Sequence, residues 1–172
     1  PQELHRKEFV DKLATCGFAR TGCEVKIVDD DDRDLPAGEI GEIVTRSDCV
    51  MAGYWQNPEA TRKAMRSGWL HTGDVGSMDA QGFLTIRDRS KDMIISGGAN
   101  IYPREIEEVL LRHPAVAECS VVGRRHPEWG EEVIAFIVAR GVVEQADLDA
   151  LCLDNIARFK NGNTLGTFEA TR

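Results

Sequence analysis

Two polar stretches hold the residues best suited to chemistry, Thr72–Asp74 and Arg87–Asp92. Asp74 follows a threonine and a glycine, and a carboxylate in such a place can accept two charge-assisted hydrogen bonds from a vicinal diol such as that of ribose. A turn aspartate that caps backbone N–H groups has the same pattern. Arg89 carries a permanently charged planar fork that suits oxygen-rich ligands, although a weak surface ion pair with a neighbouring aspartate is the alternative.

The second stretch also marks a joint in the chain. Five of the six residues from Arg87 to Asp92 are charged, so this segment belongs in solvent or against a polar ligand. A glycine pair follows, Gly97–Gly98, which can adopt positive φ or let the backbone pass a bulky group. Pro103 then opens a helical pattern, in the first turn where helices accept proline. This order is typical of a domain boundary that carries function.

Upstream of the joint the pattern is rich in β-structure. Alternating polar and apolar residues predict strands over 23–28, 40–46 and 83–87, with the first two forming a hairpin. The acidic run between them is interpreted as a solvated turn, because it lacks the closing glutamate of a calcium loop. Short helices are expected over 3–13 and 59–66.

Downstream, the pattern alternates strands and helices. The helix from Pro103 places Ile106, Val109 and Leu110 on one face. Strands are predicted over 116–122 and 132–139 with a loop over 123–130 between them. A final helix carries the apolar stripe of Leu148, Leu151, Cys152 and Ile156.

The fold class expected from these patterns is α+β. A β-rich subdomain would cover residues 1–88, and a small α+β domain would cover 89–172. The isolated histidines His71, His113 and His126 match no nucleophile motif. The three tryptophans are interpreted as packing residues, and the basic cluster from Arg124 to His126 as part of a solvated loop.

The bulk composition argues against several classes. The net charge of −8 gives no reason to expect nucleic acid or an anionic membrane as a partner. The longest apolar run, 133–139, is far too short to span a bilayer. Five cysteines without a Cys-x-x-Cys pair predict reduced thiols in a cytoplasmic protein and no metal site. Pro1, in place of methionine, suggests a fragment, an engineered boundary or a processed form.

Four motifs occur in order along the chain: Gly38–Ile43, Gly53–Thr61, Gly68–Asp74 and Ile86–Ile106. They resemble the Gly-Glu-x-Gly-Glu, Gly-Tyr-x-x-x-Pro-Glu-x-Thr, Trp-x-x-Thr-Gly-Asp and hinge motifs of the adenylate-forming (AMP-binding) enzymes. That family includes acyl-CoA synthetases, peptide-synthetase adenylation domains and luciferases. The resemblance covers roughly residues 13–160. It implies an ATP-dependent acyl-CoA synthetase, which turns a carboxylate and ATP into acyl-AMP and pyrophosphate and then transfers the acyl group to coenzyme A.

The resemblance also implies roles for single residues. Asp74 would bind the ribose of ATP or AMP, Arg89 would contact the same ribose, and Ile86 would lie beside the nucleotide. Lys91 matches the family's pivot, where a change in φ/ψ swings the C-terminal domain between two catalytic poses. The resemblance further implies that the first subdomain is distorted and barrel-like, that the second domain is mobile, and that the hinge lies near 89–92. The Mg²⁺ of the reaction would be held in the family's upstream part.

The resemblance also implies that the glycine turn binds coenzyme A. Gly97, Gly98 and Asn100 would border the passage for its pantetheine arm, where a side chain would narrow the way. The segment 97–103 resembles fatty-acid and aryl-acid CoA ligases more than peptide-synthetase domains, which usually carry Gly-x-Arg-Ile-Glu. An acyl-CoA synthetase of the fatty-acid or aryl-acid CoA ligase type is therefore expected, with a role in fatty acid metabolism. It would act on a small-molecule carboxylate whose identity and chain length the sequence does not give.

Several family features have no match in the chain. The phosphate-binding loop and the adenine motif lie upstream in the family, and no lysine follows Lys160, where the family has its catalytic lysine. Lys160 itself belongs to the preceding Ala-Arg-Phe-Lys motif, so no catalytic residue is assigned, and the tail after it is interpreted as truncated or replaced. The chain alone is expected to be inactive. The alternatives are a non-catalytic remnant that binds a nucleotide or a partner, and a peptide-synthetase adenylation domain.

Overall fold

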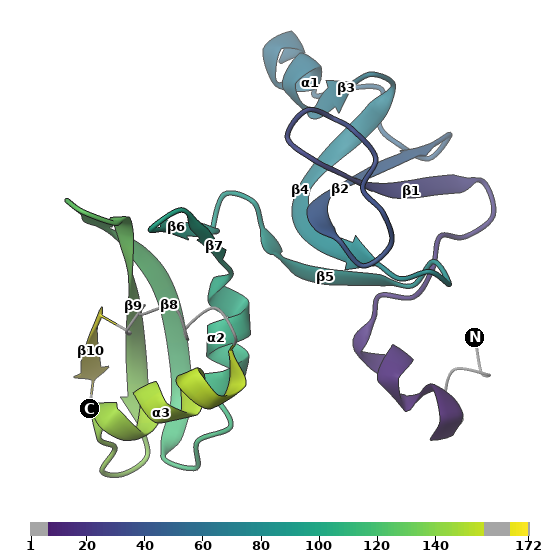
Figure 1. The fold of residues 1–172 in the computed structure, drawn as a ribbon. Helices are drawn as coiled ribbons and strands as arrows, with labels where there is room; N and C mark the ends of the chain where they lie inside the picture. The colour runs from purple at the N-terminus through teal and green to yellow at the C-terminus, as the bar shows by residue number, and fades with distance from the viewer. Residues whose placement is uncertain (1–6, 157–165, 172) are drawn as a thin grey trace. The chain divides into compact units, whose positions relative to one another are not determined.

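The computed structural model describes residues 7–156 and 166–171 (Figure 1). The chain divides into two compact units between Ser90 and Lys91, close to the expected boundary after residue 88. Each unit combines a sheet with a few short helices, so the predicted α+β class is confirmed. The mobility of the second unit stays a prediction.

The first unit is built on a five-stranded antiparallel sheet (Figure 1). Along the sheet the order is β1 (Cys23–Val28), β2 (Ile40–Ser47), β4 (Trp69–Met78) and β3 (Met65–Arg66), and β5 (Leu84–Arg89) also pairs with β4. Strand β1 pairs with β2 from Cys23 opposite Ser47 to Val28 opposite Glu42, which confirms the predicted hairpin. The buried apolar residues of these strands are Ile27, Val28, Ile43, Val44 and Val75.

Strand β4 is among the elements that the sequence pattern does not predict, because its Thr-Gly-Asp segment resembles a turn. The structure shows that Gly76 is needed for close strand packing. A Cβ at this position would lie 2.4 Å from the carbonyl oxygen of Thr85 and 2.9 Å from the Cδ1 of Ile43. A glycine inside a strand is typical of such a close backbone approach.

Two short helical segments flank this sheet. A 3₁₀ helix covers Lys7–Ala14, and the rest of the helix predicted over 3–13 lies outside the described residues. Helix α1 (Pro58–Ala64) begins at Asn57, whose side chain accepts a hydrogen bond from the Ala60 amide at 3.0 Å. It ends before the predicted limit of residue 66, because Met65 and Arg66 pair with β4 instead.

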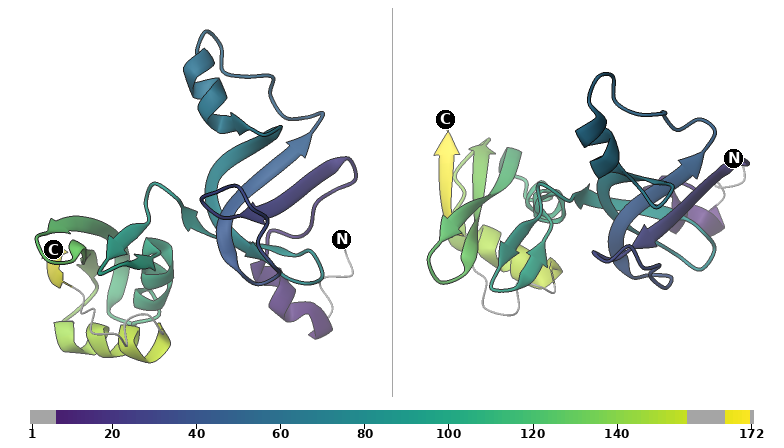
Figure 2. Two further views of the ribbon diagram at one scale, coloured as in Figure 1. Left: turned by 45° about the horizontal axis from the view of Figure 1, so that its top comes forward. Right: turned by 90° about the horizontal axis from the view of Figure 1, so that it is seen from above.

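The second unit packs two helices on a five-stranded sheet (Figure 2). The strand order is β10 (Gly166–Thr171), β9 (Gly130–Ala139), β6 (Ile94–Ser96) and β7 (Ala99–Ile101), and β8 (Val116–His126) also pairs with β9. Strand β10 runs parallel to β9, and the Ala157–Lys160 motif lies outside the described residues.

Helices α2 (Pro103–Leu110) and α3 (Gln145–Asn155) share one core with the strands. The predicted apolar face of α2 is confirmed, since Ile106, Val109 and Leu110 are all buried. The same holds for Leu148 and Cys152 on α3. Among the described residues, every helix falls short of the length and apolar character that crossing a bilayer requires.

The predicted loop over 123–130 is wrong. Strand β8 continues to His126 and β9 begins at Gly130, so only residues 127–129 form the turn. The added pairs include Arg124 opposite Glu132, whose side chains form an ion pair at 2.8 Å. Residues 123–126 are polar or glycine and therefore show no apolar alternation, and only the pairing with β9 reveals them as a strand.

Candidate nucleotide site and glycine turn

Asp74 lies on a bulge of strand β4. Glu42 on β2 is opposite Val75 and Val44 is opposite His71, so the segment Thr72–Asp74 faces Ile43 alone. Gly73 adopts φ = 73°, a left-handed conformation that glycine takes without strain. Bulges re-aim side chains and are common beside functional sites. The Thr-Gly-Asp motif therefore marks the point where β4 leaves regular pairing.

Backbone and hydroxyl hydrogen bonds hold this bulge. The Thr72 hydroxyl donates to the Ile43 carbonyl at 2.8 Å and accepts from the Asp74 amide at 3.1 Å. The Ser90 amide donates to the Gly73 carbonyl at 2.9 Å. The Asp74 carboxylate is not used in these bonds, so the turn is held without the capping role that a turn aspartate often plays.

Asp74 instead pairs with Arg89. The two residues are opposite each other on β4 and β5, and Arg89 Nε lies 3.0 Å from Asp74 Oδ1. Arg89 Nη1 also donates to the Thr72 carbonyl at 3.4 Å. Both side chains remain open to solvent, with exposed fractions of 29% for Asp74 and 55% for Arg89. A carboxylate acceptor beside a guanidinium donor fits a vicinal diol.

The third predicted nucleotide residue, Ile86, is on the same strand as Arg89. It is opposite Gly76 on β4, across a second register shift between Val75 and Gly76. Its side chain is 38% exposed, although it is a large apolar residue. The structure therefore places all three candidates on the paired strands β4 and β5 of one unit.

The Gly-Tyr-x-x-x-Pro-Glu-x-Thr motif is held together by hydrogen bonds of its threonine, Thr61. The Thr61 hydroxyl accepts from the Tyr54 amide and donates to the Asn57 carbonyl, both at 2.9 Å. Beside it lies a pocket of about 400 Å³. Its lining includes Glu42, Tyr54, Lys63, His71, Thr72 and Ser90. The motif thus holds Tyr54 at the edge of a pocket that reaches the bulge.

A polar cluster that the sequence did not reveal lies behind the bulge. His71, only 6% exposed, places its Nδ1 2.8 Å from Glu42 Oε2 and 2.7 Å from Arg66 Nη2. Arg66 also pairs with Asp32 at 3.0 Å. His71 therefore has charged partners, Glu42 and Arg66, rather than the serine or cysteine of a nucleophile motif. Asp32 of the acidic run is more than a solvated turn residue. The available signal was Glu42, the last charged residue of the Gly-Glu-x-Gly-Glu motif.

The glycine turn connects β6 and β7. Ser96 is opposite Ala99, and Gly97 and Gly98 between them have φ of 56° and 81°, as two-residue hairpin turns with positive φ require. A Cβ on Gly97 would lie 2.8 Å from the Cε3 of Trp129, whereas one on Gly98 would meet nothing within 4 Å. Only the first glycine is therefore tied to a neighbour in this unit.

The other two candidates of this region are exposed. Asn100 is on β7, opposite Ile95, and Lys91 is the first residue of the second unit. Asn100 therefore lies beside the glycine turn and Lys91 at the joint between the units. The role of Asn100 in binding coenzyme A and that of Lys91 as the pivot stay predictions.

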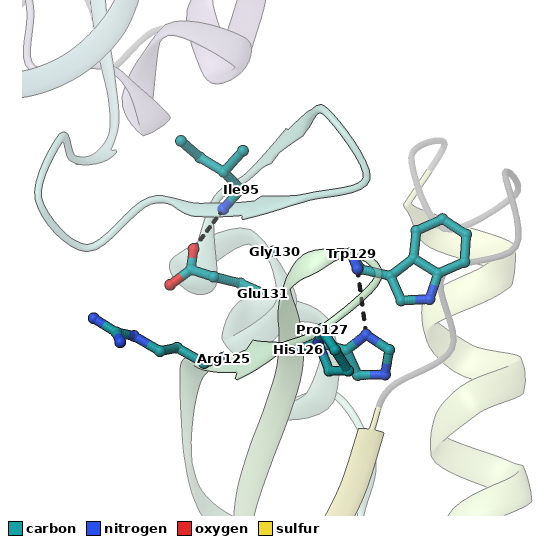
Figure 3. A pocket seen from close by; sticks show the side chains of 7 residues that line it. All are labelled: Ile95, Arg125, His126, Pro127, Trp129, Gly130 and Glu131. Carbon is teal, nitrogen blue, oxygen red and sulfur yellow. Dashed lines mark hydrogen bonds between the residues drawn. The ribbon is translucent and has the colours of Figure 1, made fainter.

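A second pocket lies between Ile95 of β6 and the turn between β8 and β9 (Figure 3). It has a volume of about 660 Å³, and its lining includes Ile95, Arg125, His126, Pro127, Trp129 and Glu131. The Ile95 amide donates to Glu131 Oε2 at 2.8 Å, and the Trp129 amide donates to His126 Nδ1 at 3.3 Å. The Gly97 amide donates to the Trp129 carbonyl at 2.9 Å.

Two tryptophan predictions need correction. Trp129 is 48% exposed and lines this pocket, so it packs on Gly97 with only part of its surface. Trp55 is 89% exposed and is not a packing residue. Trp69 is partly covered, with the Lys26 ammonium and the Arg46 guanidinium each 4.5 Å from its ring centre.

Two family models match the chain. The AMP-binding enzyme model matches residues 4–55, and the AMP-binding enzyme C-terminal domain model matches residues 105–166. A 2-succinylbenzoate–CoA ligase of Bacillus cereus is 44% identical over 152 residues, which cover 88% of this chain and 31% of that protein. The chain therefore spans about a third of the length of the curated relatives that it matches.

Solved structures give the same picture. The o-succinylbenzoate CoA synthetase of Bacillus subtilis, in complex with its acyl-adenylate intermediate, superposes with a TM-score of 0.85 at 38% identity, over 94% of this chain and 32% of that one. An amide bond synthetase of Marinactinospora thermotolerans reaches 0.84 at 37% identity, over 94% and 33%.

The relatives support a CoA ligase but not the fatty-acid part of the prediction, because their names give 2-succinylbenzoate as the acid. The two family models match different units, in the order that the four motifs predict. With the matching relatives and structures, these models show that the chain belongs to the family of AMP-binding, adenylate-forming enzymes.

Proposed function

We propose that the chain acts in the ATP-dependent ligation of a carboxylic acid to coenzyme A. A carboxylate and ATP would give acyl-AMP and pyrophosphate, and the acyl group would then pass to the thiol of coenzyme A. The observation that carries this proposal is the solvent-open pair of Asp74 and Arg89 at the bulge of β4.

The first unit would hold the ribose of the nucleotide. The Asp74 carboxylate would accept hydrogen bonds from the two ribose hydroxyls, and the Arg89 guanidinium would orient that carboxylate and donate to a ribose oxygen. The exposed side chain of Ile86 would cover an apolar face of the nucleotide. The Mg²⁺ of the reaction would be held in the upstream part of the family's proteins.

The second unit would receive coenzyme A. Gly98 leaves open space at the tip of the β6–β7 turn, and Gly97 keeps Trp129 against the turn. We propose that the pantetheine arm passes this tip beside Asn100. Lys91 would be the pivot between the adenylation and thioester-forming poses.

The proposed acid is 2-succinylbenzoate, which the names of the relatives in the genus Bacillus supply. The similarity to an amide bond synthetase favours a second candidate, in which an amine replaces coenzyme A as the acyl acceptor. The two candidates share the adenylate-forming step and differ only in what attacks the acyl-AMP.

The ribose proposal is tested by titrating the ¹⁵N-labelled chain with AMP and with 2′,3′-dideoxy-AMP. We expect AMP to shift the amide signals of Thr72–Asp74 and Arg89, and the dideoxy compound, which lacks the diol, to leave them unchanged. Equal shifts with both nucleotides would overturn the ribose role. Titration with coenzyme A should shift Gly97–Asn100 and the Trp129 indole signal instead.

The reaction itself is tested in a chimera. Residues 1–156 replace the matching segment of the Bacillus subtilis o-succinylbenzoate CoA synthetase, which keeps its own remaining residues. We expect this chimera to form acyl-AMP from 2-succinylbenzoate, and the chain alone to form none. Supplying coenzyme A or an amine in the second step decides between the two acceptors.

A further inference from the structure

We propose that Glu42 is a positioning residue of the nucleotide site, whose carboxylate holds the bulge of β4 that carries Asp74. This inference rests on the proposed function for what the bulge binds. The geometric part concerns only residues of the first unit. It gives the Gly-Glu-x-Gly-Glu motif a physical task that its sequence does not suggest.

The two oxygens of Glu42 contact different groups. Oε1 accepts a hydrogen bond from the Gly73 amide at 3.3 Å. Oε2 lies 2.8 Å from His71 Nδ1 and 3.5 Å from Arg66 Nη2. Glu42 therefore binds β4 on both sides of Thr72, through the residue before it and the residue after it.

The bulge creates the need for this carboxylate. The carbonyl of Ile43, the strand residue that faces the bulge, accepts from the Thr72 hydroxyl. The Gly73 amide is displaced from regular pairing, and a backbone donor without a partner is costly wherever water is also excluded. Glu42 supplies an acceptor from the neighbouring strand, and a charged oxygen makes a stronger bond than a neutral one.

Arg66 and His71 hold the Glu42 carboxylate through its Oε2 atom. Arg66 Nη2 lies between Glu42 and Asp32, with 3.0 Å to Asp32 Oδ1, so one guanidinium faces two carboxylates. His71 is almost fully covered and fixes the position of Oε2. Long acidic side chains lose much rotamer freedom when they are held, and this cluster removes that freedom before any ligand binds.

The bulge passes this restraint to the proposed ribose contacts. Gly73 is adjacent to Asp74, and the Asp74 amide donates to Thr72 Oγ1. Arg89 reaches the Thr72 carbonyl with Nη1 and the Asp74 carboxylate with Nε. A shift of the Thr72–Gly73 backbone would therefore displace both groups that the proposed function assigns to the diol. Outer residues that hold ligand-binding residues in place commonly matter nearly as much as the binding residues.

The experiment compares the chain with Glu42→Ala, Glu42→Gln and the matched control Glu24→Ala. Glu24 is a carboxylate of the same sheet that also binds an arginine, Arg46 at 2.7 Å, but it lies on β1, which β2 separates from β4. For each protein, NMR titration gives the ratio of the affinities for AMP and for 2′,3′-dideoxy-AMP. Amide hydrogen exchange of Gly73 and the carboxyl carbon signal of Asp74 are recorded without ligand.

We expect Glu42→Ala to lower the affinity for AMP about tenfold, as the loss of a hydrogen bond to a charged acceptor does, and to lower the ratio equally. Gly73 exchange should become faster and the Asp74 signal should shift. Glu42→Gln keeps one oxygen for the Gly73 amide, so its affinity ratio and its Gly73 exchange rate should lie between those of the wild type and of Glu42→Ala. Glu24→Ala should match the wild type. A purely structural role would lower thermal stability and leave the ratio unchanged.

Each outcome decides one of the two ideas. If the wild type binds AMP and 2′,3′-dideoxy-AMP with equal affinity, the ribose role is rejected. The hydrogen exchange of Gly73 and the carboxyl signal of Asp74 would still test the positioning role in that case. Unchanged exchange and an unchanged Asp74 signal in Glu42→Ala would reject positioning, whatever the ratio is. If Glu42→Ala does not fold, Glu42→Gln gives the same two ligand-free readouts, and wild-type values there would overturn the proposal.

Discussion

Asp74 and Arg89 depend on each other at the scale of single residues. Their 3.0 Å contact holds a carboxylate and a guanidinium on adjacent strands where solvent reaches both. Exposed ion pairs contribute little to stability, so this pair should add little to the stability of the fold. In the proposed function its value lies in orientation, because the guanidinium would keep the carboxylate from rotating and leave it free to accept from a diol.

Replacing Asp74 by alanine tests the residue directly. The loss of a charged acceptor costs roughly 1.5–3 kcal/mol, about a ten- to hundredfold drop in affinity for AMP. Asp34→Ala is the control, since Asp34 also pairs with a basic residue, Lys26, on the surface of the same unit. Titration of both variants with AMP gives the two dissociation constants, and an unchanged value for Asp74→Ala would remove this residue from the site.

The cysteines should differ in reactivity. Burial raises the pKa of Cys152 to about 12, with smaller contributions from Asp149 and Cys119. Burial also raises the pKa of Cys119 to about 11, with a smaller contribution from Glu107. Because the thiolate is the nucleophile, both should resist iodoacetamide at pH 8.

The exposed Cys16 and Cys49 serve as the internal control for this reaction, since their side chains are open to solvent. Mass spectrometry of the folded chain should find these two labelled first. In urea all the cysteines should label alike. Early labelling of Cys152 in the folded chain would contradict the buried position on α3.

At the scale of elements, the two glycines of the β6–β7 turn have different surroundings, so substitutions at them should have different effects. Gly97→Ala adds a left-handed alanine, which costs roughly 1–2 kcal/mol, and also a clash with the Trp129 ring. Gly98→Ala adds only the backbone cost. We therefore expect Gly97→Ala to lower the free energy of unfolding more and to shift the Trp129 indole signal. Urea unfolding of both variants gives the comparison, and equal losses would show that Trp129 does not rest on Gly97.

The turn before β5 should make the first unit sensitive to acid. The hydrogen bond from Lys12 lowers the pKa of Asp79, and the amides of Phe83 and Gln81 add to the effect. A carboxyl with a depressed folded pKa stabilises the fold above its unfolded value, near ~3.9, and this stabilisation is lost as the pH falls through the folded value.

The test is urea unfolding at pH 7 and at pH 3. Asp79→Asn should lose less stability between these two pH values than the wild type does. Lys12→Met should reduce the difference as well, because it removes the largest cause of the pKa shift. An identical pH dependence in all three proteins would show that Asp79 does not contribute to it.

At the scale of the molecule, the division between Ser90 and Lys91 coincides with the charged segment Arg87–Asp92. Each unit has its own sheet and its own buried residues. Segments that join such units and carry little apolar surface permit domain motion. This arrangement is what the proposed swing at Lys91 requires.

Lys91→Pro in the chimera tests that swing. Proline fixes φ near −65° and removes an N–H, so we expect the thioester-forming step to slow more than adenylation. Rapid-quench measurements give the two rates separately. Lys91→Ala keeps the backbone free and should change neither rate much. Equal losses in both steps for the proline variant would move the pivot to another residue.

The sequence by itself determined the elements whose signal is local. The β1–β2 hairpin follows from alternation, and helices α2 and α3 follow from apolar residues at helical spacing. The family likewise follows from four short motifs, and its models match both units. Each of these features depends on residues close together in the chain.

The tertiary structure decided what depends on register between strands. Strand β4 looks like a turn until β2 and β5 pair with it, and only that pairing places Asp74 opposite Arg89. Glu42 reaches Gly73 across the same sheet, and Trp129 covers Gly97 from another hairpin. Such contacts join residues far apart in sequence, and a single residue's shift in pairing would turn each side chain to the other face. No local pattern records that choice, because it is made by the packing of the whole sheet.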